Sequence, residues 1–307
     1  MGLADVGHVY GEIASHDAET LCNVIERSCR LRALLTNQSL QQRIGTIEKL
    51  PSLPKLYHDL MSAMGRPEVS CRMVADIIER DSAMSAKILQ LANSAYFGAT
   101  KSISRIDHAI VYLGLELVKN LALSVHVFAS LTEQRVESSL ESLQEHAIRT
   151  ARVAKRLLPA EQKAQQAFTA ALLHDVGQVV LAVCIPEGHR QVVETSRRSG
   201  RPLHEVETEV LGVDHAAAGA YLLGLWGLPF PIVEAVAYHH DPGGAGERTF
   251  DVASATALAD SLVEAVTSSN ASAIDSSHLQ ELNVLTELPR WTEIAQQELS
   301  AERIVID

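Results

Sequence analysis

The chain has 307 residues, of which 38 are acidic and 26 are basic, and its formal net charge is −12. This length is enough for two domains, and the negative charge opposes nonspecific binding to nucleic acid phosphates and to an anionic membrane surface. We therefore expect neither a nucleic acid nor a membrane as a partner. Aromatic residues make up only 4% of the chain, whereas alanine and leucine are abundant and favour helix over sheet. The composition predicts an all-α protein.

No feature of the sequence predicts export or disulfide bonds. The cysteines, which form no Cys-x-x-Cys pair, are Cys22, Cys29, Cys71 and Cys184. Residues 1–5 have neither the basic region nor the apolar core of an export signal. The apolar run at residues 172–185 is broken by His174, Asp175 and Gln178, so we do not expect it to span a membrane. These features predict a protein of the reducing cytoplasm.

The first predicted helix begins after Asp17, a good N-cap residue, and places its arginines toward its C-terminal end, where the helix dipole favours cations. These arginines are Arg27, Arg30 and Arg32. Its apolar stripe consists of Leu21, Val24, Ile25, Ser28 and Leu31. Exposed apolar surface of this kind recruits a second chain or folds back. We expect a homodimer through this helix; the alternative is a monomer in which it docks onto residues 38–131.

Residues 38–131 are predicted to form a first helical subdomain. Helices are expected at residues 55–64, 73–80, 82–93, 103–110 and 117–127, with Ser70 and either Asp81 or Ser82 as caps. The last two helices, joined by a turn that ends at Gly114, could form a DNA-binding helix-turn-helix. The second of them carries only one base, Lys119, so we favour a simple packing corner.

An imidazole and a carboxylate, those of His174 and Asp175, lie side by side in an otherwise apolar helical run, residues 170–177. A buried carboxylate that keeps its charge needs a cation or a dense set of hydrogen bonds, and a neutral histidine supplies a nitrogen donor for the same cation. The pair therefore predicts half of a metal site. The alternative is that both side chains only cap or hydrogen-bond neighbouring backbone.

Further donors on four other predicted helices favour the metal site. His146 lies at the edge of the apolar stripe of one helix, Asp214 is expected to cap a second that begins with His215, a third ends at residues 239–240, and a fourth covers residues 252–266. The expected metal ligands are His146, His174, Asp175, His215, His239, His240 and Asp260. Such nitrogen and oxygen donors suit Fe, Mn, Zn or Ni, and a carboxylate such as that of Asp175 can bridge two ions.

Three other features lie near or after these donors. His189 and His204 fall in a charged stretch, residues 186–211, so we expect solvated side chains rather than ligands. Residues 241–246 are glycine-rich and are predicted as a flexible loop that could admit a ligand. In the tail, Trp291 is predicted to be a core or interface anchor.

The order His, His-Asp, His, His-His, Asp resembles the metal-dependent phosphohydrolases of the HD superfamily, and other motifs resemble the HDOD family more narrowly. These motifs are LPSLP at residues 50–54, IERD at 78–81 leading into LQLANSA at 89–95, AIVYLG at 109–114 and LLGLWGLP at 222–229. The resemblance covers nearly all of residues 44–260. It implies a helical bundle of two subdomains, residues 38–135 and 136–266, followed by a helical tail, residues 267–307.

Residues 1–37 resemble the last helix and linker of the response-regulator receiver domains that precede HDOD domains. The resemblance rests on SHDAETL at residues 15–21 and RLRALL at residues 30–35. A receiver needs far more chain, and the Lys-Pro pair usual before that helix is absent, so we expect the phosphoacceptor half to be missing. This likeness implies a bacterial regulator of two-component signalling.

Two functions follow from the resemblance. The first is a metal-dependent phosphohydrolase, such as a cyclic-dinucleotide phosphodiesterase, in which two bridged ions activate hydroxide. The similar HD-GYP enzymes carry a lysine where this chain has Gln178, a Tyr-Pro pair in the loop after His240, and often a glutamate where Ser142 stands. The second is a non-catalytic regulatory module that retains a metal site and binds signalling proteins. We favour the module, because the groups that would stabilise a transition state are missing.

Overall fold

The computed structural model describes residues 18–36, 44, 55–93, 103–132, 137–268 and 276–300. Every regular element within these ranges is a helix, and they contain no strand. The predicted all-α class is therefore confirmed. Asp17, the predicted N-cap of the first helix, lies outside the described residues, so its capping role stays a prediction.

A smaller group of helices forms one end of the molecule. It consists of α3 (Lys55–Met64), α4 (Cys71–Ile78), α5 (Ser82–Ala92), α6 (Ile106–Leu113) and α7 (Leu115–Thr132). Two predicted caps are present, because the Ser70 hydroxyl accepts from the Met73 N–H at 3.2 Å and the Asp81 carboxylate accepts from the Met84 N–H at 2.9 Å. These bonds satisfy N–H groups that a helix start leaves without a partner.

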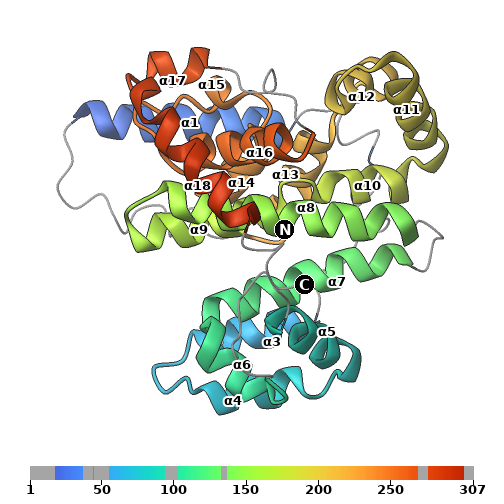
Figure 1. Cartoon of the computed structure of the whole chain (residues 1–307), viewed down its shortest axis with the longest axis vertical. Helices are drawn as coiled ribbons and strands as arrows, with labels where there is room; N and C mark the ends of the chain where they lie inside the picture. The colour runs from blue at the N-terminus through green and yellow to red at the C-terminus, as the bar shows by residue number, and fades with distance from the viewer. Residues whose placement is uncertain are drawn as a thin grey trace.

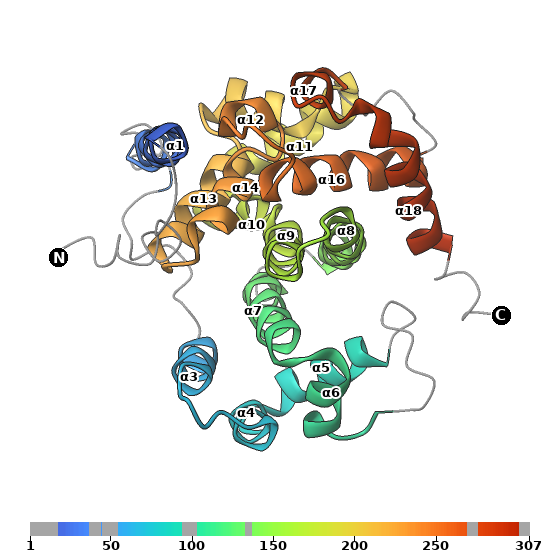
Figure 2. The ribbon, with the colours of Figure 1, turned by 90° about the vertical axis from the view of Figure 1, so that its left-hand side faces the viewer.

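The larger group carries all the predicted metal ligands. It consists of α8 (Glu137–Leu157), α9 (Glu161–Leu173), α10 (Val176–Cys184), α11 (Pro186–Ser199), α12 (Leu203–Leu211), α13 (His215–Leu225), α14 (Phe230–Ala237), α15 (Pro242–Ala245), α16 (Val252–Ser268), α17 (Ser277–Glu281), the short 3-10 helix η4 (Leu285–Glu287) and α18 (Leu288–Ser300). Figures 1 and 2 show this body at the end of the molecule opposite to α3–α6, with α7 between them. The boundaries at residues 135 and 266 stay predictions.

Helix α7 joins the two groups. It follows a turn at Gly114, whose φ of 88° lies in the region that favours glycine. The helix contacts α3, α5 and α6 on one side and α9 and α10 on the other. Within residues 115–124, the part of α7 whose side chains are described, the buried residues are Val118, Asn120, Leu121, Ala122, Leu123 and Ser124. The α6–α7 pair is therefore a packing corner, the arrangement favoured by the sequence.

The apolar segment that contains His174 is two helices and not one. Helix α9 ends at Leu173 and α10 begins at Val176, so His174 and Asp175 lie at a break in the axis. By length and composition the Glu161–Cys184 segment could cross a membrane, but 78% of its most apolar window is buried inside the protein. It is thus the core of the larger group. The break places both polar side chains at a helix end, where they face the neighbouring helices.

Gly177 allows α10 and α13 to approach closely. A Cβ atom at Gly177 would lie 1.8 Å from the carbonyl oxygen of His215 and 2.6 Å from the backbone nitrogen of Gly219. Because no side chain fits there, this contact requires glycine. The close packing brings the start of α13, where His215 lies, next to the α9–α10 break.

Other parts differ from the sequence predictions. Residues 186–211 are two helices, α11 and α12, rather than an undivided charged stretch, and residues 242–245 of the expected flexible loop form the one-turn helix α15. Trp291, by contrast, is a core anchor as predicted. It is buried, and its ring stacks on that of Phe250 with the ring centroids 4.3 Å apart.

The first helix, α1 (Ala18–Leu35), docks on the larger group, where it contacts α13 and α15. Leu31 is buried, and the Leu35 side chain lies 3.2 Å from the position of a Cβ on Gly224. Docking onto residues 38–131, the alternative to a dimer, is therefore wrong, because α1 packs against the opposite half. Ile25 remains 53% exposed, and the homodimer stays a prediction.

Candidate metal centre

The structure brings all seven predicted ligands together. They come from α8, the α9–α10 break, the start of α13, the turn after α14, and α16. Neighbouring imidazole rings of the group lie 3.9–5.3 Å apart between centroids. The donors form three sets, and within each set the ligand atoms lie within 4.8 Å of one another. The sets are His146, His174 and Asp260; His174, Asp175 and His239; and His215, His239 and His240. Five segments far apart in the sequence therefore meet at one point.

Asp175 lies between two of these sets. Its Oδ2 is 3.4 Å from the Nε2 of His174, and its Oδ1 is 3.1 Å from the Nε2 of His215. A carboxylate whose two oxygens face different donor sets has the orientation needed to bridge two ions. On the far side of His174, Asp260 lies 3.5 Å from its Nε2 and 2.8 Å from the Nε2 of His146.

Three histidines are oriented by hydrogen bonds from their Nδ1 atoms. His174 donates to the carbonyl of Ala171 at 2.6 Å, and His239 donates in the same way to Val236 at 2.8 Å. In both cases the acceptor is three residues upstream, at the end of the preceding helix. Such bonds fix the tautomer and leave Nε2 as the ligand atom.

The third histidine, His215, is held by Glu207, a residue that sequence reasoning missed. Its Nδ1 donates to the Glu207 carboxylate at 2.6 Å, and its backbone N–H donates to the same oxygen at 2.8 Å. A carboxylate behind a metal-binding histidine orients the ring and increases its basicity. Glu207 is fully buried, which is rare for a glutamate without a bonded partner.

A signal for Glu207 is present in the sequence. Within α12 the apolar residues are Leu203, Val206, Val210 and Leu211. Position 207 completes the spacing i, i+3, i+4, i+7, i+8 that marks the buried face of a helix. A glutamate on that face predicts a buried carboxylate with a partner, whereas the neighbouring Glu205 and Glu209 lie on the exposed face.

Two buried imidazoles are held protonated by carboxylates. Burial alone opposes a charge on His174, but Asp175 and Asp260 outweigh burial and raise its pKa to about 9. Burial likewise opposes a charge on His215, but Asp175 and Glu207 raise its pKa to about 10. The two carboxylates of the centre therefore attract positive charge to the Nε2 positions.

The pKa values of four other groups of the centre are lowered rather than raised. Burial alone would raise the pKa of the Asp175 and Asp260 carboxyls, but the neighbouring histidines hold both well below the ordinary value. Burial lowers the pKa of His239 to about 3, and the charges of His174 and His215 add to the shift. Burial and the adjacent His239 also lower the pKa of His240. The centre thus contains two anionic carboxylates, two neutral imidazoles (His239 and His240) and two protonated ones (His174 and His215), whose protons a metal ion would replace.

His239 provides a further test of whether a metal fits. Its Nε2 is buried and has no hydrogen-bond partner among the described residues. A buried polar atom without a partner costs free energy, unless a ligand or ion satisfies it. His239 belongs to two of the three donor sets. The donor set and this nitrogen fit a divalent ion of the Fe, Mn, Zn or Ni type.

A cavity of about 740 Å³ opens onto the donors. His204, expected to be solvated, lines this cavity and stacks on His240 with ring centroids 4.0 Å apart. His204 is thus half-buried rather than fully solvated, and it belongs to none of the three donor sets. His189 is half-buried rather than solvated, and burial lowers its pKa. The charged sequence around these two residues predicts neither the stacking of His204 nor the burial of His189.

Few positive charges face this cavity. Among the described residues that line it, Arg201 is the only lysine or arginine. Its guanidinium is bonded to Glu209 at 2.6 Å and to Glu205 at 3.4 Å. At the position expected for the HD-GYP lysine, the Gln178 amide donates to the Asp175 carboxylate at 2.8 Å. Gln178 thus stabilises a ligand and supplies no charge.

Comparison with known proteins shows the family and the fold. An uncharacterized protein of Treponema pallidum is 29% identical over 256 residues, which cover 82% of this chain and 49% of that protein. The chain thus spans about half the length of this relative.

Two solved structures share the fold. One, from Shewanella amazonensis SB2B, is of a protein whose name proposes a phosphohydrolase; its TM-score is 0.66 at 22% identity, and the match covers 88% of this chain and 98% of that one. The other, from Marinobacter aquaeolei VT8, is of a protein whose name proposes a role in signal transduction; its TM-score is 0.66 at 21% identity, with coverages of 92% and 65%. The HDOD domain model matches residues 50–242, more than half of the chain, and the chain therefore belongs to the HDOD family.

Proposed function

We propose that this protein is a metal-binding regulatory module of HDOD type, which acts through signalling partners and does not hydrolyse phosphate esters at a useful rate. The observation that carries the proposal is the charge of the cavity. The one guanidinium among the described residues that line it, that of Arg201, is already bonded to two glutamates. Glu264 adds a further carboxyl to the cavity wall.

Phosphoryl transfer needs positive charge around the equatorial oxygens of the phosphate as well as at the nucleophile. A bound metal ion would supply a Lewis acid and a hydroxide at the centre. His174, Asp175 and His239 form one donor set that would hold it, and His215 faces the other oxygen of Asp175. The remaining walls offer amide, imidazole and carboxyl groups, and Gln178 stands where the related enzymes have a lysine. The residues therefore support metal binding more strongly than catalysis.

The alternative function is a metal-dependent phosphohydrolase. Two observations favour it: the cavity is large enough for a substrate and opens onto the donors, and Asp175 has the orientation of a bridging carboxylate. The name of the similar Shewanella protein proposes such an activity. Against it stands the absence of an available cation among the described cavity residues.

Signalling proteins are the proposed partners, and the homodimer through α1 remains one proposal for the assembly. On α6, Val111 is 74% exposed and Tyr112 is 47% exposed. Exposed apolar side chains next to each other support a contact with another protein. A cytoplasmic location and a receiver origin for α1 are likewise proposals that rest on the sequence.

One preparation tests both functions. The purified protein is analysed for Fe, Mn, Zn and Ni, and the same sample is assayed with bis(p-nitrophenyl) phosphate and with a cyclic dinucleotide. Asp175→Asn, which removes the bridging charge, is the matched control. Bound metal with no turnover above that variant supports the module. Metal-dependent turnover that the variant loses supports the hydrolase, and a protein that binds no metal contradicts both.

A further inference from the structure

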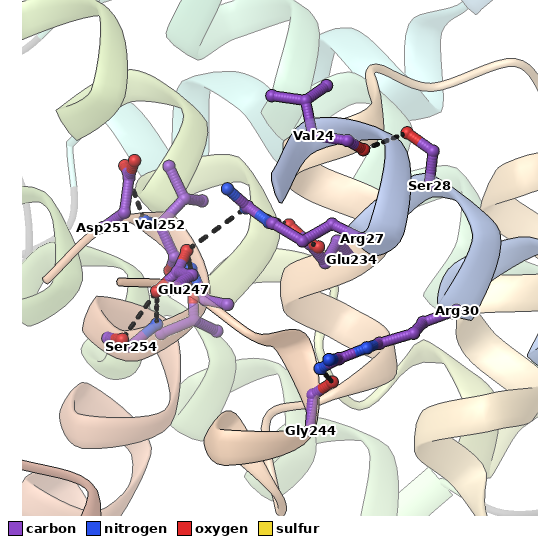
Figure 3. A network of polar contacts seen from close by, with 12 residues as sticks. Val24, Arg27, Ser28, Arg30, Glu234, Gly244, Glu247, Asp251, Val252 and Ser254 are labelled. Carbon is purple, nitrogen blue, oxygen red and sulfur yellow. Dashed lines mark hydrogen bonds and ion pairs between the residues drawn. The ribbon is translucent and has the colours of Figure 1, made fainter. Parts of the chain in front are cut away.

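Helix α1 inserts an arginine into a buried acidic socket, which we define as Glu234 and Glu247. The Arg27 Nε donates to Glu234 at 3.0 Å, and its Nη2 donates to the other oxygen of that carboxylate. The same Nη2 lies 3.6 Å from Glu247. Figure 3 shows Arg27 extending from α1 between the two glutamates. A guanidinium with two donors on one carboxylate is a specific, directional contact.

The socket depends on this cation. Both glutamate side chains are only 1% exposed. Burial raises the pKa of the Glu234 carboxyl, Arg27 opposes this, and the charges of Glu247 and Asp251 raise it further. Removing one member of a buried ion pair leaves a charge that neither water nor a partner compensates, which strongly destabilises the fold. Without Arg27 the two carboxylates would have to separate, take up protons or reach water.

Each glutamate of the socket belongs to a segment that delivers metal donors. Glu234 lies on α14, five residues before His239. Glu247 holds the start of α16, since it accepts from the backbone N–H groups of Ala253 and Ser254 at 3.1 and 3.0 Å. Helix α16 carries Asp260. A shift of either helix would therefore move a donor.

The socket also reaches the cavity wall. The Ser254 hydroxyl donates to Glu247 at 2.6 Å, so it accepts from the Nε2 of His278 at 2.8 Å. His278 and Ser254 both line the cavity. A second arginine of α1, Arg30, donates from its Nη1 to the carbonyl of Gly244 at 3.4 Å. Gly244 lies in α15, which follows His240. Helix α1 thus touches the surroundings of the centre at two places.

We propose that Arg27 is a positioning residue for the metal centre, so that the geometry of the donors depends on whether α1 is docked. This inference rests on the metal centre proposed above. The Arg27 guanidinium adds a link from α1 to Glu234 on α14 and to Glu247 just before α16, two helices that also pack directly against each other. A partner or an upstream segment that pulls α1 away would loosen His239, His240 and Asp260 together. The socket therefore couples an event at α1 to the centre, as a two-state contact between two sites does.

Manganese affinity of the whole chain tests the inference, measured by calorimetry and by the electron paramagnetic resonance of bound Mn²⁺. Arg27→Met removes the charge and keeps an unbranched side chain, and Arg32→Met on the exposed side of the same helix is the control. We expect Arg27→Met to weaken Mn²⁺ binding at least tenfold, in the range seen when groups behind metal ligands are lost, and Arg32→Met to leave it unchanged. Hydrogen exchange should show that α1 and the start of α16 lose protection in Arg27→Met alone.

A rescue variant separates positioning from a loss of folding. Arg27→Met combined with Glu234→Gln removes the uncompensated charge without restoring the contact of α1, so it should recover the stability of the fold while the Mn²⁺ affinity stays weak. If Arg27→Met does not fold, Arg27→Lys takes its place, and its single ammonium should give an intermediate affinity. Unchanged affinity in Arg27→Met with α1 released would overturn the coupling and leave the metal centre standing. A wild-type chain that binds none of Mn²⁺, Fe²⁺, Zn²⁺ or Ni²⁺ would remove the centre itself, and the coupling with it.

Discussion

Glu207 accepts two hydrogen bonds from His215, one from the ring and one from the backbone, at 2.6 and 2.8 Å on the same oxygen. The carboxylate therefore sets both the direction of the ring and the start of α13. This contact links α12, which covers the cavity, to the donor cluster below it. A substitution at Glu207 should consequently affect the centre although it replaces no proposed ligand.

Replacing Glu207 by glutamine should weaken metal binding about tenfold to a hundredfold, because the neutral amide orients His215 less firmly and makes its Nε2 a weaker donor. Zn²⁺ affinity measured by competition with a chromogenic chelator checks this. The control is Glu205→Gln, on the exposed face of the same helix. Equal affinities for wild type and Glu207→Gln would show that this carboxylate has no role in the centre.

Gly177→Ala should destabilise the fold and disturb the centre at once. The added Cβ would meet the His215 carbonyl oxygen at 1.8 Å, so α10 and α13 must separate, at a cost of about 1–3 kcal/mol or more. Gly65→Ala is the control, since its nearest neighbour would be an ordinary 3.5 Å away. Urea unfolding measures the difference, and a variant as stable as wild type would contradict the close packing.

The stability of chelator-treated protein should depend on pH in two directions. Folding raises the pKa of His174 from 6.5 to about 9 and that of His215 to about 10. Their protons stabilise the fold fully below about pH 6.5, and this contribution is lost as the pH rises through 9 and 10. Folding lowers the pKa of His239 from 6.5 to about 3, so stability is also lost as the pH falls below about 6.5.

We therefore expect the free energy of unfolding to be greatest near pH 6.5 when a chelator is present. Added metal should remove most of the alkaline loss, because it replaces the two protons and binds more tightly as they leave. Urea unfolding between pH 5 and pH 10, with and without Mn²⁺, measures both curves. A chelated protein that becomes steadily more stable up to pH 9 would contradict the assigned charges.

Replacing Gln178 by lysine should not create a phosphodiesterase. The lysine would put a cation beside Asp175, but the loop after His240 still lacks the Tyr-Pro pair, and Arg201 remains bonded to glutamates. Turnover of a cyclic dinucleotide should stay within a few-fold of the wild-type level, with metal content measured in the same samples. A rise of several orders of magnitude would mean that one missing charge was the whole defect, and would favour the hydrolase.

Local signals in the sequence predict much of this fold. The cap at Asp214, whose carboxylate accepts from the Ala217 N–H at 2.8 Å, and the place of His146 at the edge of the buried face of α8 follow from cap chemistry and helical spacing. The break at His174 does not, because the apolar run contains no glycine or proline before it. Sequence spacing therefore identified the donors but not the helix ends that aim them.

Contacts between distant segments account for the rest. The stacking of His204 on His240 depends on how α12 lies over the turn after α14, and the ion pair of Arg27 with Glu234 joins residues 207 positions apart. Charged neighbours led to the expectation of a solvated His204. Helical spacing signals that Glu207 is buried, but only the assembled helices show that its partner is His215.

The most direct measurement of the central claim is a crystal structure of the protein loaded with Mn²⁺ or Zn²⁺, with anomalous diffraction recorded at the edge of the metal. The account predicts an anomalous peak within bonding distance, about 2.0–2.2 Å, of the Nε2 of His239 and of a carboxylate oxygen of Asp175 or Asp260. The strongest support would be two anomalous peaks, one on each side of the Asp175 carboxylate. A peak elsewhere in the molecule, or no peak at saturating metal, would contradict the proposed centre.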